Sequence, residues 1–164
     1  MFLRPEPLDH ALGRSRGGFT TKIHALIDHR MRPVVFELTA GQDGDNPQLV
    51  PLLDQWPAGR GRLGDVQLLA DKAYSHPSTR AELRRRRIRH TIPERADQRE
   101  HRARRGSRGG RPPNFNPGAY AHRNTVERGF GRLKQWRGIA SRYDKYALTF
   151  LGGVLLAAIL QYRQ

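Results

Sequence analysis

Four side chains that suit a phosphate-handling site lie close together in the last third of the chain. They are Tyr120, Arg123, Glu127 and Lys134, which follow one another at spacings of three, four and seven residues within the run YAHRNTVERGFGRLK. A helix turns about 100° per residue, so all four would lie within about 60° on one helical face. A phenol, a guanidinium, a carboxylate and an ammonium group side by side suit a site that binds phosphate and a metal. A solvated charged helix has the same spacing.

The helix that must position these residues also needs an apolar face. The pattern predicts one helix over Gly118–Gln135, and Val126, Phe130 and Leu133 form an apolar stripe beside the charged one. Such a helix buries the apolar stripe and presents the charged stripe at its edge.

A second carboxylate, Asp71, directly follows the short apolar segment VQLLA, which predicts a central, buried strand over Val66–Ala70. In α/β sheets, ligands commonly bind at the carboxyl ends of strands. An Asp that caps the following turn fits the same position. Two carboxylates from separate elements suit Mg²⁺, which prefers hard oxygen ligands and keeps waters that phosphates can replace.

The remaining pattern predicts an α/β chain, in which a hairpin precedes alternating helices and strands. Strands are expected at 19–28, 34–39, 66–70 and 88–92; helices are expected from Pro47 on and at 76–87, 118–135 and 146–162. Residues 1–18 are expected to form a polar arm, and residues 94–117 a basic loop.

Composition favours a polyanionic partner, because 30 Lys+Arg against 15 Asp+Glu give a net charge of +15. Nucleic acid is the best fit, although an RNA-binding structural protein would carry the same charge. The chain has no cysteine, which excludes disulfides and thiolate zinc sites and fits a reducing cytoplasm. The apolar run Ala147–Leu160 is too short to cross a membrane.

Arginine-rich segments are candidates for contacts with a nucleic-acid backbone. One is RRRRIR at 84–89, and the other lies within the basic loop at Arg102, Arg104, Arg105 and Arg108. Such contacts supply affinity and salt dependence rather than sequence choice. A solvated charge run is the alternative interpretation.

Three separated blocks carry a family resemblance. They are GRSRGGFTTKIHALID (13–28), LLADKAY (68–74) and VERGFGRLKQWRGIASRYDKYALTFLGGVLLAAIL (126–160). In order and separation they resemble DDE transposases of bacterial insertion sequences, of the IS-five-like group. The spacing Tyr-x2-Arg-x3-Glu-x6-Lys resembles that family's signature around its last catalytic acid. The resemblance extends from about Gly13 to the C-terminus.

The resemblance implies a ribonuclease H-like fold, with a mixed sheet flanked by helices. It makes Asp71 and Glu127 catalytic metal ligands, for two Mg²⁺ ions or for Mn²⁺. It places Tyr120, Arg123 and Lys134 in the signature, and Lys72 beside Asp71 is a further candidate for a DNA-backbone contact. The implied substrate is double-stranded DNA, both element ends and target. A homo-oligomer on DNA, in the nucleoid of a bacterial cytoplasm, is expected.

The family's first catalytic Asp has no convincing counterpart. Asp9 lies in a Pro-rich polar stretch, and Asp28 suits a hairpin turn. We therefore expect residues 19–164 to form a catalytic domain that lacks its first strand and Asp. A truncated gene, an upstream reading frame that supplies the missing segment, or a misplaced start would explain this. The alternative is a non-catalytic basic DNA-binding remnant, or an inhibitor of a transposase.

Overall fold

The computed structural model describes residues 10–163, and these divide into two compact units. Residues 10–44 and 125–163 form one unit, here called the hairpin unit, and residues 45–124 form the other, here called the Asp71 unit. Each unit has its own buried side chains, so each is described by itself. The predicted polar arm lies outside the described residues up to position 9.

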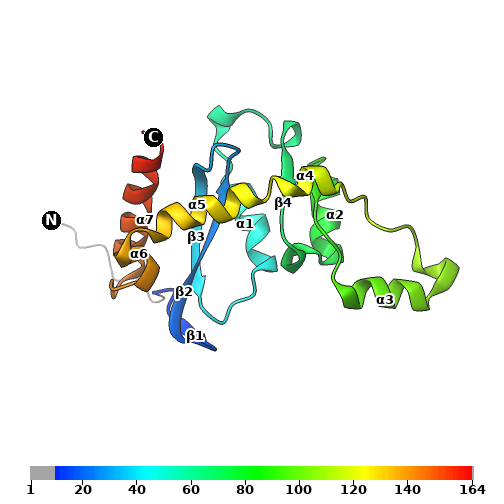
Figure 1. Cartoon of the computed structure of the whole chain (residues 1–164), viewed down its shortest axis with the longest axis horizontal. Coiled ribbons are helices and arrows are strands. Elements are labelled where there is room, and N and C mark those ends of the chain that lie inside the picture. Colours follow the sequence, from blue (N-terminus) through cyan, green and yellow to red (C-terminus); the bar gives the residue numbers. More distant parts are fainter. Residues whose placement is uncertain (1–9, 164) are drawn as a thin grey trace. The chain divides into compact units, whose positions relative to one another are not determined.

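The sheet of the hairpin unit is antiparallel and three-stranded, in the order β1-β2-β3 (Figure 1). Its strands are β1 (Gly13–Ser15), β2 (Gly18–Ile27) and β3 (Pro33–Ala40). The predicted hairpin of two strands is confirmed. The prediction that residues 13–15 belong to a loop is wrong, because the chain reverses at Gly17-Gly18 and pairs these residues with β2.

Three helices complete the hairpin unit: α5 (Asn124–Lys134), α6 (Arg137–Ser141) and α7 (Ala147–Gln161). Their core consists of Leu133, Ile139, Phe150, Val154, Ala157 and Ala158, packed against Ile23, Phe36, Leu38 and Phe130. The apolar stripe of α5 and the apolar run of α7 therefore meet the side chains of the hairpin. Along residues 10–163, no helix combines the length and apolarity needed to cross a membrane.

Two glycines of α5 give a matched test of this packing. A methyl group added at Gly129 would lie 3.0 Å from Ile27 Cδ1 and 3.2 Å from the Met31 carbonyl oxygen, whereas one added at Gly131 meets nothing within 4 Å. Gly131→Ala should raise the free energy of unfolding by about 0.5–1 kcal/mol through helix propensity. Gly129→Ala should lower the free energy of unfolding, because the Ile27 side chain and the Met31 carbonyl cannot both move away from the added methyl group. Urea unfolding measures both, and equal changes in the two variants would contradict this packing.

The Asp71 unit alternates helices and strands. Its helices are α1 (Leu49–Asp54), α2 (Pro77–Arg85), α3 (Ala96–Arg104) and α4 (Pro117–Ala121). Its strands β4 (Gln67–Leu69) and β5 (Arg89–Thr91) pair in parallel, with α2 between them in sequence. The predicted helices near Pro47 and at 76–87, and the predicted strand at 88–92, are confirmed.

Two sequence predictions for this unit are wrong. The strand after Val66 is neither central nor fully buried: it is one of two strands, Leu68 and Leu69 are half-buried, and Gln67 is exposed. The basic loop contains α3, whose start is stabilised because the Arg95 backbone N–H donates to Gln98 Oε1 at 3.2 Å. A helix with no apolar periodicity gives no pattern for sequence reasoning to detect.

The α/β class is confirmed, but the single mixed sheet is not found. Over residues 10–163 the strands form two sheets, one antiparallel and one parallel.

Candidate active site

Asp71 lies where the sequence predicts it, directly after β4. Its Oδ1 accepts a hydrogen bond of 2.5 Å from the Ala73 N–H, so the carboxylate caps the short 3₁₀ turn Lys72–Tyr74. The side chain is still 39% exposed, and Oδ2 lies 3.7 Å from Arg123 Nη2. One oxygen fixes the orientation of the carboxylate, and the other faces a cation.

The Asp71–Arg123 ion pair joins two segments that are far apart in sequence. The Arg123 guanidinium lies near the Asp71 carboxylate, a contact that the helical spacing does not predict. The guanidinium also has further N–H donors with which it can bind a phosphate.

Tyr74, three residues after Asp71, is a neighbour that sequence reasoning missed. Burial raises the pKa of its phenol from 10.0 to about 12, and the charges of Asp45 and Asp71 add to the shift, while Arg123 opposes it. The phenol therefore stays protonated at neutral pH and remains a hydrogen-bond donor. The order Asp-x-x-Tyr within one turn is the local signal that would have found it.

The raised pKa of Tyr74 predicts a loss of stability in alkali. Because the folded-state pKa lies above the ordinary value, the stabilisation is complete below pH 10 and disappears as the pH rises through 12. It amounts to at most about 2.7 kcal/mol for two pKa units. Tyr74→Phe should remove this part of the decline between pH 10 and pH 12 in urea unfolding. A decline in Tyr74→Phe equal to that of the wild type would rule out the effect.

The single helix predicted over Gly118–Gln135 is broken. Helix α4 ends at Ala121, α5 begins at Asn124, and His122 and Arg123 form a turn between them. Asn and Thr at 124 and 125 favour a helix start over a helix interior, because their side chains bond to nearby backbone groups. The four signature residues therefore do not form one continuous helical stripe.

The break distributes the signature between the two units. Tyr120 is half-buried on α4, its ring centroid 5.2 Å from that of Phe115, while Glu127 and Lys134 are exposed on α5. Arg123 belongs to the Asp71 unit, and Glu127 to the hairpin unit. Within residues 10–163 no three His, Cys, Asp or Glu side chains are grouped so that they can hold a metal. Asp28 accepts from the N–H groups of the turn at Arg30 and Arg32, as a hairpin-turn residue does.

The candidate DNA-contacting side chains differ in exposure. Lys72, Arg104, Arg105 and Arg108 are exposed. Arg102 instead lies half-buried and pairs with Glu94 at 2.6 Å, so it has a structural role in the fold of α3.

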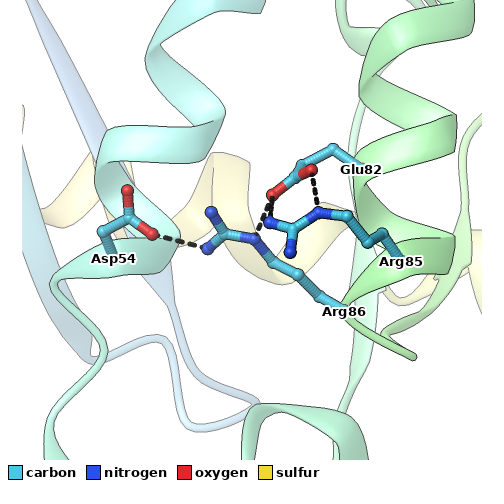
Figure 2. Close-up of polar contacts among 4 residues, drawn as sticks. All are labelled: Asp54, Glu82, Arg85 and Arg86. Carbon is cyan, nitrogen blue, oxygen red and sulfur yellow. Dashed lines mark hydrogen bonds and ion pairs between the residues drawn. The ribbon is translucent and has the colours of Figure 1, made fainter.

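Part of the arginine run at 84–89 also pairs within the protein. Arg85 and Arg86 both donate to Glu82, and Arg86 reaches Asp54 on α1 at 2.6 Å (Figure 2). These hydrogen bonds lower the pKa of Glu82 to about 2. At neutral pH the two guanidiniums are therefore engaged by carboxylates, and the run presents less free charge than its sequence indicates.

Comparison with known proteins identifies the class. A family model described as a transposase DDE domain matches residues 5–161, so the chain belongs to this family of DDE transposases. The chain is also 30% identical, over 141 residues, to a putative transposase for insertion sequence element IS6501 of Brucella ovis (strain ATCC 25840 / 63/290 / NCTC 10512). The alignment covers 86% of this chain and 96% of that relative. No solved structure matches the chain.

Membership in the family gives the general function, which is DNA transposition. The family resemblance noted in the sequence is thus confirmed at the level of the DDE transposase.

Proposed function

We propose that the chain carries out metal-dependent phosphoryl transfer on insertion-sequence DNA, as a member of the IS-five-like group. The reaction is hydrolysis at the element ends, followed by attack of the freed 3′ hydroxyl on target DNA. The observation that carries the proposal is the oriented Asp71 carboxylate, with Arg123 at 3.7 Å, in a chain of the DDE transposase family.

Asp71 and Glu127 are the proposed metal ligands. Both are carboxylates with solvent access, which fits the hard oxygen donors that Mg²⁺ prefers. Bound Mg²⁺ would supply stabilisation of the attacking and leaving oxygens of the displacement. The proposal requires the two carboxylates to come within about 10 Å of each other, a distance that serves ions about 4 Å apart. Asp71 and Glu127 would be two of the three carboxylates that the family uses.

The cationic residues are proposed to hold the DNA strand. Arg123 would offset the negative charge at Asp71 and bind a phosphate oxygen, with Tyr120 and Lys134 of the signature also facing the strand. Lys72, which follows Asp71 on an exposed turn, would contact the backbone further along. A guanidinium presents a planar pair of donors that matches phosphate geometry.

A strand-cleavage assay tests the function. The purified chain is incubated with duplexes carrying the ends of its own element, with Mg²⁺ or Mn²⁺, and compared with a fusion that adds an upstream segment bearing the family's first Asp strand. Cleavage by the fusion and none by the chain alone is the expected result. No cleavage in either case, with binding intact, would favour the alternative of a DNA-binding remnant or inhibitor. A homo-oligomer on DNA and a nucleoid location belong to the same proposal.

The salt dependence of DNA binding should depend on the exposed arginines at and just after the C-terminal end of α3. Arg104, Arg105 and Arg108 are exposed, whereas Arg102 is paired with Glu94. Replacing the three exposed arginines by Gln should reduce the slope of log K against log[salt] by about 3, since each phosphate contact contributes about 0.9. Fluorescence anisotropy between 50 and 200 mM salt, the range over which such slopes are usually read, measures it. An unchanged slope would show that these arginines are only solvated.

The matched control for this experiment replaces paired arginines. Arg85 and Arg86 are held by Glu82, so Arg85→Gln with Arg86→Gln should change the salt slope less than the triple variant. A larger effect from the control pair would indicate that the DNA-binding surface lies on α2 instead.

A further inference from the structure

Strand β1 and the first residues of β2 form a short two-stranded ribbon, which lies at one end of β2 (Figure 1). Gly13 pairs with Thr20, Arg14 with Phe19 and Ser15 with Gly18. The Ser15 hydroxyl donates to the Gly18 carbonyl at 3.1 Å and accepts from the Gly17 N–H at 3.2 Å. Gly18 has φ 108°, a conformation that favours glycine. The turn is therefore held in one shape before any ligand binds.

This ribbon presents an exposed aromatic ring together with two exposed cationic side chains. Phe19 is 75% exposed, the highest exposure of any large apolar side chain in residues 10–163. Arg14 lies directly opposite it on β1, and Arg16 lies in the turn; both are exposed. Cross-strand partners have their side chains on the same face of a ribbon, so the ring and the Arg14 guanidinium share a face.

Covering this phenyl ring with a partner removes apolar surface from water and is therefore favourable. The partner must offer an apolar flat surface with negative charge on either side, and base pairs bordered by phosphates have this arrangement. A second copy of the chain fits poorly, because it carries the same net charge of +15 and would bring cations toward cations.

We propose that the β1–β2 hairpin is a DNA-contacting finger, in which Phe19 packs against bases while Arg14 and Arg16 bind the flanking phosphates. The inference rests on the proposed function, since it takes duplex DNA as the substrate. Phe side chains that enter duplex DNA act as wedges between base steps and partly unstack them. A step that is already weakened costs less to unstack, so the finger favours it.

The experiment measures binding of the full chain to two short duplexes of the same arbitrary sequence, one with a single mismatch. The wild-type chain should prefer the mismatched duplex. Phe19→Ala should abolish the preference and weaken binding to that duplex by about 5- to 100-fold. Phe19→Trp should keep it, because the indole also stacks. Leu148→Ala, at another highly exposed apolar side chain, should leave both affinities unchanged.

The contribution of Arg14 and Arg16 is tested by the slope of log K for DNA binding against log[salt]. Arg14→Ala and Arg16→Ala should each lower it by about 1 and leave the mismatch preference intact. An unaltered preference in Phe19→Ala would overturn the proposal. So would a loss of self-association in Phe19→Ala by sedimentation without a loss of DNA affinity, because Phe19 would then face a second copy. A wild-type chain that binds no DNA would overturn the proposed function as well, whereas failure of the finger alone leaves salt-dependent binding in place.

Discussion

Asp71→Asn and Glu127→Gln should each reduce strand cleavage by more than about 10³-fold, in the chain alone or in the fusion, whichever of the two cleaves. Both substitutions keep the shape of the side chain and remove the charge that a metal ligand needs. Loss of a metal that stabilises both reacting oxygens is a loss of several kcal/mol, and each 1.36 kcal/mol is tenfold in rate. The measurement is the initial rate of cleavage of end-labelled element DNA at saturating Mg²⁺.

DNA binding by the same two variants separates a catalytic role from a structural one. Removing a negative charge reduces repulsion of phosphate, so both variants should bind at least as tightly as the wild type. Glu100→Gln, at an exposed carboxylate on α3, is the control and should cleave at the wild-type rate. Cleavage that survives in Glu127→Gln would remove this residue from the active site. Because Asp71 also caps a turn, its variant should be checked for the wild-type unfolding midpoint.

Phe150→Ala should cost about 3–5 kcal/mol of stability, the usual range for deleting a buried aromatic ring. Phe150 is 2% exposed at the centre of the core between α7 and the hairpin. The Arg142 guanidinium lies 5.2 Å from its ring centroid, so truncation removes a cation–π contact as well as apolar packing.

Leu148, on the same helix and 67% exposed, is the matched control for this prediction. Leu148→Ala should change the free energy of unfolding by less than about 0.5 kcal/mol. Urea unfolding followed by far-ultraviolet circular dichroism compares the two variants. Similar effects of both substitutions would mean that α7 packs with a different face toward the sheet.

The elements with strong local patterns were predictable from sequence. The alternation in FTTKIHALID and the β-branched run after Pro33 gave the hairpin, and the apolar run after Tyr146 gave α7. Helix α3 was not predictable in this way, because all its side chains are at least partly exposed and its sequence has no apolar period. The end of α4 was missed because the helical spacing continues across His122 and Arg123, although their N–H groups bond to carbonyls three residues back, as in a turn.

The candidate site was predictable only as separate parts. Asp71 was predicted because a carboxylate follows an apolar strand, and Glu127 because of its spacing from the signature residues. The Asp71–Arg123 pair is a contact between distant segments, and no local pattern of residues reports it. Arg102 was predicted to contact a nucleic-acid backbone, but its sequence neighbours do not show that it pairs with Glu94. These contacts depend on how the chain folds back, which a spacing rule does not describe.

The two units complete their synthesis at different times. The Asp71 unit is one continuous stretch, residues 45–124, whereas the hairpin unit needs the last forty residues, 125–164. Domains fold as units during translation, N-terminal parts first. Until α7 has been synthesised, the hairpin therefore lacks the helix that packs against Ile23, Phe36 and Leu38. A premature stop codon after Asn124 would leave the sequence of the Asp71 unit complete. The hairpin would then expose apolar side chains to solvent, and chaperones and proteases recognise such surfaces.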